Sequence, residues 1–479
     1  MSLIDIRALL PLIIPAASAV FIMLVISVYR AHLLTFLLTI AGLLLAFSSL
    51  FAVSPLLPLQ VTKLLVLDSY AFFFMGLIIL AAIVTAIFSY GYLGKSSVIR
   101  EEYYLLMLLA VVGACVLVAS SHFISFFLGL EALSVSLYPL IAYQRSGERG
   151  IEAGIKYLVL AAVSSSFLLF GMALIYFEAG TMEFSRLSLL LNNTNSSILY
   201  LSGSVMLLTG IGFKLGVVPF HLWTPDVYEG APAPVTGFVA TVSKGAVFAL
   251  LLRYFGAHNQ HLGSSLFTIF TVSAAASMLV GNLLALLQNN VKRILAYSSI
   301  SHLGYLFVAF LAGGELAVTA VMFYLTAYFV TTLGAFGTIT VLSDGAEEAG
   351  TLENFRSLAF DRPWLAGVFA AMIFSLAGIP LTAGFVGKFY LMYAGVTSAL
   401  WFLVILLVIS SAIGLFYYLR IILVMFEPQE KTAQGTTHPF PPVPLAGGAM
   451  LAMLTLILIL LGVYPSPLMQ VIQNMAGLP

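Results

Sequence analysis

The sequence contains very few charged residues. Of its 479 residues, 8% are Asp, Glu, Lys or Arg and 61% are hydrophobic, whereas soluble globular proteins carry roughly 25% charged residues. Water would drive such a chain to aggregate, so most of its surface must face lipid, and a soluble globular protein is excluded. The 19 basic residues are balanced by 19 acidic ones, so no basic excess indicates nucleic-acid binding.

Cysteine is nearly absent as well. The one cysteine, Cys115, lies in an apolar run, and a structural zinc site or an iron–sulfur cluster needs about four ligands. The sequence also shows no phosphate-binding glycine loop, no cluster of metal ligands and no nucleophile constellation. We therefore expect no cofactor or metal site in this chain, and we expect any electron transfer to belong to another chain.

Long apolar runs dominate what remains. A bilayer core about 30 Å thick requires about 20 apolar residues per helix, and such runs predict an all-α integral membrane protein of about fourteen transmembrane helices. The first run is too long for a signal-peptide core and more spans follow, so we interpret it as a retained helix. The runs lie near residues 9–29, 33–53, 70–90, 103–120, 122–142, 153–177, 197–218, 233–252, 265–287, 293–312, 315–341, 364–395, 398–426 and 443–464.

Two of these runs are interrupted by glycine and proline. The seventh contains Gly216-Val-Val-Pro219 and the twelfth contains Gly378-Ile-Pro380. Proline removes a backbone donor and clashes with the preceding turn, and nearby glycines ease the break. Paired interruptions in corresponding halves are the best sequence indication of a transporter's ion site. The expected segments of this one membrane domain are helices 1–3 (1–102), a first half of helices 4–8 (103–254), a second half of helices 9–13 (255–426), and a polar loop with helix 14 (427–479).

The distribution of Lys and Arg between loops predicts the orientation. Loops on the side of the N-terminus contain four basic residues and loops on the opposite side contain eleven, which places both termini outside the cytoplasm. The four are Arg7, Lys63, Arg186 and Arg253, and the eleven are Arg30, Lys95, Arg100, Arg145, Arg149, Lys292, Arg293, Arg356, Arg362, Arg420 and Lys431.

Five ionisable residues fall inside predicted spans. Lys156, Lys214, Lys244 and Lys388 are the basic residues that no loop contains, and Glu131 is the acid near the middle of a span. An isolated lysine at the bilayer centre costs about 2.5–3.5 kcal/mol on insertion scales, so these groups must be paired, hydrated or neutralised. Burial favours the neutral form of amines and carboxyls alike. A buried lysine can then bind and release a proton near physiological pH, and we predict that these residues move protons.

Each of the five also has a structural interpretation. Glu131 could form a static ion pair between two helices, and Lys156, a few residues into its span, could extend its ammonium to the membrane surface. Lys214 and Lys388 lie beside the two interruptions, where freed carbonyls can hold water. Lys244 has no acid next to it in the sequence, which packing explains poorly. We favour proton transfer for all five.

Two histidines and two acids complete the candidates. His302 could relay protons between the lysines of the eighth and twelfth spans, or it could be a hydrogen-bonded core residue. His221 follows the interruption of the seventh span, where a position at a helix end is the simpler interpretation. Asp226 and Glu229 are expected in a loop, where they would be solvated or would cap a helix.

Three stretches give these residues a specific context. They are residues 213–235, which contain His221-Leu-Trp-Thr-Pro-Asp-Val-Tyr-Glu-Gly-Ala-Pro-Ala-Pro234, residues 292–305 and residues 378–390. The chain resembles the antiporter-like subunits of respiratory complex I, and the match covers nearly its whole length. It is most similar to the N-type subunits of bacterial NADH:quinone oxidoreductase. Few residues follow the last span, which leaves no room for the lateral helix of L-type subunits, and Lys388 stands where M-type subunits have a glutamate.

This resemblance implies a fold and a set of roles. The family has two inverted five-helix halves with discontinuous helices 7 and 12. Carried over by motif, Glu131 and Lys214 form the pair that modulates proton loading, and Lys244 is the central proton carrier. Lys388 hands protons over through polar residues and water near His302. The lysine of the sixth span, Lys156, is a possible partner of the buried glutamate.

The resemblance also implies partners and a location. The chain would be a subunit of a translocase in a bacterial inner membrane, with both termini on the periplasmic side. It would contact other membrane subunits, including neighbouring antiporter-like ones. NADH, FMN, the iron–sulfur clusters and quinone would be bound by those partner subunits.

Two other functions fit parts of the same pattern. A D-type subunit of a multisubunit sodium/proton antiporter would share the fold and the ionisable residues but would be driven by ion gradients. A purely structural membrane spacer would hold the same charges in locked pairs. Replacing Lys244 by a neutral residue separates the spacer from both transporters, because a spacer would not need that proton-binding group.

Overall fold

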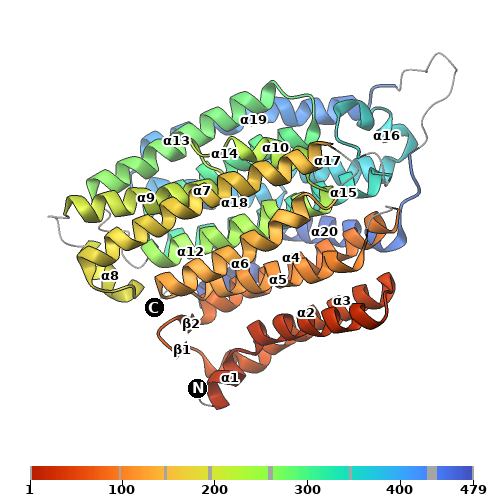
Figure 1. Cartoon of the computed structure of the whole chain (residues 1–479). Helices are drawn as coiled ribbons and strands as arrows, with labels where there is room; N and C mark the ends of the chain where they lie inside the picture. Colours follow the sequence, from red (N-terminus) through yellow and green to blue (C-terminus); the bar gives the residue numbers. More distant parts are fainter. Residues whose placement is uncertain are drawn as a thin grey trace.

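The computed structural model describes residues 3–95, 99–144, 148–191, 197–256, 263–344, 348–428 and 440–476. Within these residues, thirteen helices are long and apolar enough to cross a membrane. They lie side by side in one bundle, as Figure 1 shows. The predicted all-α membrane fold is therefore confirmed. The predicted run at 364–395 is the exception among the fourteen, because it forms two shorter helices, α17 and α18.

The chain begins with helices α1 (Leu3–Ala8), α2 (Leu10–Val28), α3 (His32–Val53) and α4 (Ser69–Gly94), with a short 3-10 helix η1 (Ser54–Leu56) and the strands β1 (Leu59–Val61) and β2 (Leu65–Leu67) between α3 and α4. The strands pair antiparallel, with Leu59 opposite Leu67. The next helices are α5 (Glu101–Val118), α6 (Phe123–Ile141), α7 (Glu148–Ala179), α8 (Phe184–Leu191), α9 (Ile198–Leu215), α10 (Trp223–Gly230), α11 (Ala233–Phe238), the π-helical turn η2 (Val239–Ser243) and α12 (Lys244–Gly256).

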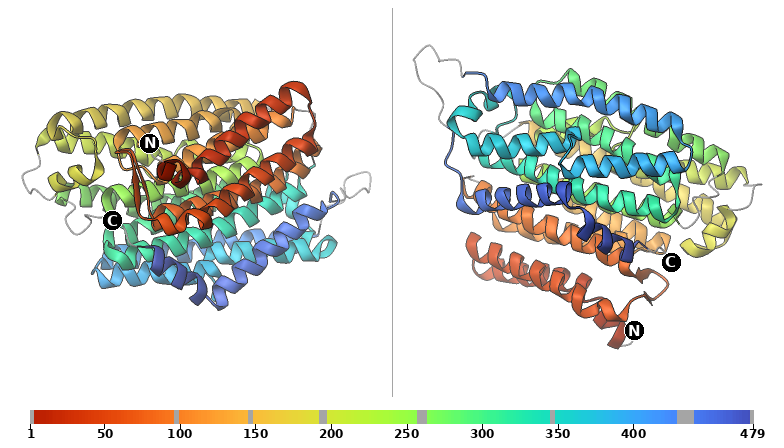
Figure 2. Two further views of the ribbon diagram at one scale, coloured as in Figure 1. Left: turned by 90° about the horizontal axis from the view of Figure 1, so that it is seen from below. Right: turned by 180° about the vertical axis from the view of Figure 1, so that it is seen from behind.

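The second part of the chain contains α13 (Ser264–Leu286), α14 (Val291–Ala312), α15 (Gly314–Leu342), the 3-10 helix η4 (Leu352–Phe355), α16 (Leu358–Asp361), α17 (Pro363–Ala377), α18 (Ala383–Thr397) and α19 (Trp401–Met425). The last helices are α20 (Leu445–Val463) and α21 (Ser466–Met475). Figure 2 shows that α1 and α21 lie at the same end of the bundle. The loop residues Arg145 and Lys431, used above for orientation, fall outside the described residues.

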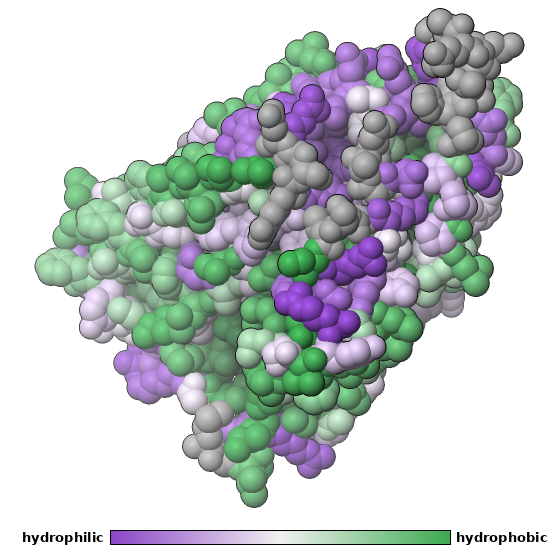
Figure 3. Space-filling view, turned by 45° about the vertical axis from the view of Figure 1, so that its right-hand side comes forward, coloured by the Kyte–Doolittle hydropathy of each residue, from purple (hydrophilic) through white to green (hydrophobic). Residues whose placement is uncertain are grey.

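The core of the bundle is formed by the eighth, tenth and eleventh predicted spans. The segment that contains α11, η2 and α12 is entirely buried, and α14 and α15 are nearly so. By contrast, only about a third of α2 and of α20 is buried. Figure 3 shows extended hydrophobic areas on the surface, with hydrophilic residues gathered in separate patches. This distribution is what a lipid-facing protein requires.

The first predicted interruption is a regular helix end. At Gly216 the backbone enters the left-handed region, with φ of 71°, which glycine adopts without strain. Its N–H bonds Phe213 O at 2.9 Å, and the N–H of Val217 bonds Gly212 O at 3.1 Å. This pattern is the Schellman motif, which satisfies the last carbonyls of a helix. Pro219 follows and cannot continue α9.

The second interruption repeats this geometry at the end of α17. Gly378 has φ of 85°, its N–H bonds Ser375 O at 3.1 Å, and the N–H of Ile379 bonds Phe374 O at 3.0 Å. Pro380 follows. The two predicted breaks are confirmed, and both leave a helix C-terminus, with its partial negative charge, inside the bundle.

Candidate functional site

Glu131 and Lys214 lie close together. Lys214, in the last turn of α9, donates a hydrogen bond from Nζ to Ser134 Oγ at 2.7 Å. Ser134 lies one turn beyond Glu131 on α6, so the lysine is bound to the part of α6 that carries the glutamate. Glu131 also accepts a hydrogen bond from Ser165 of α7 at 2.5 Å. The two charges are therefore neighbours that serine hydroxyls hold in place on three helices.

Lys244 is the first residue of α12 and is 1% exposed. Its Nζ donates to Ser299 Oγ of α14 at 2.9 Å, and Tyr328 OH donates to the same hydroxyl at 2.8 Å. The Nζ also lies 5.2 Å from the centroid of the Tyr228 ring. In the described part of the chain, hydroxyls and ring faces surround this ammonium, and no carboxylate lies within ion-pair distance. A hydroxyl can accept one hydrogen bond while it donates another, so this surrounding can pass a proton.

The C-terminal end of α9 also lies close to Lys244. A Cβ at Gly216 would lie 2.4 Å from Thr224 Oγ1 and 3.5 Å from Lys244 Nζ, so the helix end, the hydroxyl and the ammonium meet at one point. Thr224 Oγ1 is buried without a protein hydrogen-bond partner, and a buried hydroxyl of this kind usually binds water. His221, three residues earlier, is also buried, and its role stays a prediction.

Lys388 occupies the corresponding place at the second break. Its Nζ donates to Leu376 O at 3.0 Å and to Ala377 O at 2.8 Å, and it also donates to Ser411 Oγ at 2.8 Å. The two carbonyls belong to the last turn of α17. A cation at a helix C-terminus is favoured by the helix dipole, so the break itself provides the counter-charge for this buried ammonium.

One face of α14 connects the two lysines. Ser299 contacts Lys244, and His302 follows one turn later on the same face. Tyr305 follows after a further turn, and the centroid of its ring lies 5.3 Å from Lys388 Nζ. The spacing of three residues therefore lines up a hydroxyl, an imidazole and a phenol between the two ammonium groups.

His302 is held by two tyrosines. Its Nδ1 is hydrogen-bonded to Tyr324 OH at 2.6 Å and its Nε2 to Tyr418 OH at 3.1 Å. Tyr418 OH is also hydrogen-bonded to Ser298. Both ring nitrogens are thus engaged with groups that can donate or accept. The histidine has the position expected of a relay and also the hydrogen bonds expected of a core residue.

Of the two interpretations of Lys156, the structure agrees with the one in which its side chain extends to the end of the bundle. The expected partner, Glu131, is bound by Ser165 instead. Lys156 forms ion pairs with Glu152 at 2.6 Å and with Asp226 at 2.9 Å, and 42% of its side chain is exposed. The physical reason is its place near the start of α7, from which a long side chain reaches the end of the bundle. Pairing with the buried glutamate is therefore wrong for this residue.

The expectation that Asp226 and Glu229 lie in a solvated loop is also wrong. Both belong to the short helix α10. Arg293 binds both carboxylates at 2.9 Å, and Arg149 binds Glu229 at 3.0 Å. With Lys156, these residues form an ion-pair network at the end of the bundle that is opposite to α1.

Two buried ion pairs were not foreseen. Arg253 binds both oxygens of Asp68 at 2.8 Å and donates from Nε to Val118 O, so it is not a loop residue at the surface. Lys292 is 1% exposed and is paired with Glu348. In both cases the acid lies far away in the sequence, and no local spacing could have indicated it.

Comparison with known proteins gives consistent results. The family described as "NADH:quinone oxidoreductase/Mrp antiporter, TM" matches residues 120–414. The chain is 52% identical to NADH-quinone oxidoreductase subunit N of Nitrosospira multiformis, over 99% of this chain and 97% of that protein. It is 49% identical to subunit N of Ectopseudomonas mendocina, over 98% and 96%. Its structure resembles a chain of respiratory complex I from Thermus thermophilus with a TM-score of 0.81 and 32% identity, over 96% and 98%.

The family match covers more than half of the chain, and both relatives exceed the identity at which folds and families are shared. The chain therefore belongs to the antiporter-like membrane subunits of NADH:quinone oxidoreductase, in the group of the N subunits.

Proposed function

We propose that this chain carries protons across the membrane through Glu131, Lys214, Lys244, His302 and Lys388. The observation that supports this most is the row of Ser299, His302 and Tyr305 on α14 between the two central ammonium groups. Each group along the row can bind or release a proton or can orient water.

The groups along the row differ in how they are stabilised. Glu131 lies beside Lys214, so a proton or a counter-charge at one changes the proton affinity of the other. Among the described residues, Lys244 has hydroxyls, aromatic rings and the end of α9 around it and no carboxylate within ion-pair distance, so it depends on water and on these neighbours for stabilisation. Lys388 is stabilised by the carbonyls at the end of α17. Lys156, exposed and paired at the end of the bundle, would act at the entrance rather than inside the row.

The two halves of the proposed pathway correspond to residues 103–254 and 255–426. Each half contains one helix that ends at a left-handed glycine followed by proline, Gly216 in the first and Gly378 in the second. Each glycine lies beside a lysine ammonium. An inverted repeat would produce this recurrence, with residues 1–102 and 427–479 packed around the repeat.

The termini would lie on the periplasmic side of a bacterial inner membrane. Helix α10, which carries Asp226, lies toward the end of the bundle that is opposite to the two termini (Figure 1). The larger number of basic residues at the network end supports a cytoplasmic location for that end.

The energy for transport would come from other subunits. The curated relatives are named as subunits of NADH-quinone oxidoreductase, and this chain has one cysteine. NADH, FMN, the iron–sulfur clusters and quinone would therefore be bound elsewhere, and the chain would contact neighbouring membrane subunits, among them other antiporter-like ones. The alternative is a D-type subunit of a sodium/proton antiporter, which the same family description includes. The relatives that are about half identical to this chain are named as oxidoreductase subunits, which favours the first function.

The test uses the intact complex in membrane vesicles. We expect Glu131→Gln and Lys388→Met to lower the number of protons pumped per NADH oxidised, while the complex assembles. Lys63→Met is the matched control, because that lysine is 77% exposed and forms only a surface ion pair. Normal pumping by both assembled variants would contradict the proposal.

A further inference from the structure

We propose that Lys292 and Glu348 form a clamp that sets the position of Lys244, and this inference rests on the proposed function of Lys244. The clamp is defined as these two side chains together with the backbone that they bind at the corner between α10 and α11. Nothing in the family comparison assigns a role to either residue.

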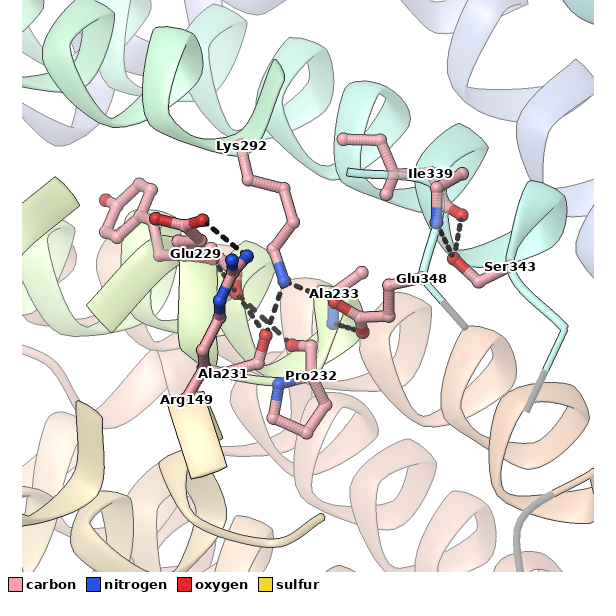
Figure 4. A network of polar contacts seen from close by, with 12 residues as sticks. Arg149, Glu229, Ala231, Pro232, Ala233, Lys292, Ile339, Ser343 and Glu348 are labelled. Atoms are coloured by element: carbon pink, nitrogen blue, oxygen red, sulfur yellow. Dashed lines mark hydrogen bonds and ion pairs between the residues drawn. The ribbon is translucent and has the colours of Figure 1, made fainter. Parts of the chain in front are cut away.

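The clamp residues are tightly packed. Lys292, near the start of α14, donates from Nζ to Ala231 O at 2.6 Å and forms an ion pair with Glu348. The other oxygen of Glu348 accepts hydrogen bonds from Ala233 N at 2.7 Å and from Tyr92 OH at 2.5 Å. Figure 4 shows the Lys292 ammonium and the Glu348 carboxylate side by side at the corner that contains Ala231, Pro232 and Ala233.

Each charge meets a helix end of opposite polarity. Ala231 follows α10 as its C-cap, where a helix carries partial negative charge, and this is where the ammonium binds. Ala233 is the first residue of α11, where the partial charge is positive, and this is where the carboxylate binds. The pair therefore fixes the joint between α10 and α11. Glu348 satisfies the N–H of Ala233, and Lys292 adds a charged donor to Ala231 O, which also accepts from Thr236 Oγ1 at 3.3 Å.

The joint leads directly to Lys244. Helix α11 continues into the π-helical turn η2, and the next residue is Lys244. The π-helical geometry is rare and is frequently found at functional sites. On the other side of the joint, α10 carries Tyr228, whose ring faces the same ammonium. A movement of the joint would therefore move both Lys244 and its aromatic neighbour.

Helix α14 carries both the clamp lysine, Lys292, and Ser299, which binds Lys244. Lys292 and Ser299 are seven residues apart, which is about two turns, and they lie on the same face. Lys292 holds the joint and Ser299 binds Lys244. The segment from α10 to α12 is thus attached to one rigid helix at several points, because Arg293 of α14 also binds both carboxylates of α10. The clamp is the attachment at the corner between α10 and α11.

A buried ion pair is an expensive way to obtain stability, because desolvation of both charges offsets their attraction. Lys292 is 1% exposed and the side chain of Glu348 is 19% exposed. A role in holding the geometry near Lys244 would explain why Lys292 and Glu348 are charged, whereas a role in packing alone would not.

The experiment compares Glu348→Gln with Asp344→Asn in the intact complex. Asp344 lies four residues away and forms a looser ion pair with Lys95 at 3.5 Å, with 76% of its side chain exposed. We measure protons pumped per NADH oxidised in vesicles as a function of pH, with Lys244→Met as a reference. We expect Glu348→Gln to lower the ratio toward that of Lys244→Met and to shift the pH profile of pumping by at least about half a unit, because the partners of Lys244 are displaced.

Two further variants keep the test decisive. The exchange of both residues, Lys292→Glu with Glu348→Lys, should not restore pumping, because each charge would then face a helix end of its own sign. Tyr92→Phe removes one hydrogen bond to Glu348. We expect this variant to assemble even if Glu348→Gln does not, and we expect it to shift the pH profile of pumping by less than Glu348→Gln.

The outcomes separate the clamp from the proposed function. If Lys244→Met pumps normally, the proposed function fails. If Lys244→Met loses pumping while Glu348→Gln or Tyr92→Phe keeps the wild-type ratio and pH profile, the clamp is overturned. Full rescue by the exchange would also overturn it, because a simple ion pair would then be sufficient.

Discussion

Replacement of Gly216 by alanine tests the geometry at the first break. With φ of 71°, an alanine there would cost about 1–2 kcal/mol in backbone strain. The new Cβ would also lie 2.4 Å from Thr224 Oγ1. Cβ atoms do not approach other atoms this closely in real structures, so Thr224 or the end of α9 must shift. Such overpacking lowers the free energy of unfolding by about a further 1–3 kcal/mol.

A second glycine provides the matched control. Gly180 has φ of 65°, and nothing lies within 4 Å of a Cβ built on it. Gly180→Ala therefore carries the backbone strain without the clash. We expect Gly216→Ala to be more destabilising than Gly180→Ala by about 1–3 kcal/mol. We also expect it to lower proton pumping, because Lys244 Nζ lies 3.5 Å from the same Cβ position.

The assay measures the thermal inactivation of each purified complex and proton pumping in vesicles. A double variant, Gly216→Ala with Thr224→Ala, removes the clashing oxygen and should recover most of the difference between the two single glycine variants. Equal effects of Gly216→Ala and Gly180→Ala on stability, or no recovery in the double variant, would show that the crowding at this break is not as described.

The remaining predictions concern three other sites. Asp68→Ala leaves Arg253 buried without its carboxylate, so we expect the free energy of unfolding to fall by about 3–5 kcal/mol. The measurement is the amount of assembled complex, and wild-type amounts would contradict the buried pair. Lys156→Met should lower the pumping ratio less than Lys388→Met, because exposed ion pairs contribute about 0–1 kcal/mol; the reverse order would refute its placement at the surface. His302→Phe should slow pumping without loss of assembly if the imidazole is a relay, and unchanged pumping would leave only its core role.

The sequence predicted the membrane fold and the breaks for clear physical reasons. Few charges and long apolar runs leave no other fold class, and glycine followed by proline ends a helix regardless of tertiary context. The lysines at 214, 244 and 388 were identifiable because an ammonium in an apolar span has few structural explanations. All three are buried in the structure.

The sequence could not predict which distant residues form ion pairs. Asp68 and Arg253 are 185 positions apart, and Lys292 and Glu348 are 56 apart, so only the packed bundle shows these pairs. The error at Lys156 has a related cause: a lysine near the start of a span can turn to either side, and the ion-pair network at the end of the bundle decides which. Helix α10 was mistaken for a loop because Pro225 and its two acids resemble turn residues, although proline is favoured in a first helical turn.

Proton pumping by Lys244→Met tests the central claim most directly. The measurement is the number of protons translocated per NADH oxidised by the assembled complex in sealed vesicles, alongside Lys63→Met. A proton carrier that is hydrogen-bonded to a hydroxyl and lies beside aromatic rings cannot be replaced by a thioether, so the ratio should fall for Lys244→Met and stay at the wild-type value for Lys63→Met. An unchanged ratio for Lys244→Met would contradict a pathway through this residue and would favour a structural spacer.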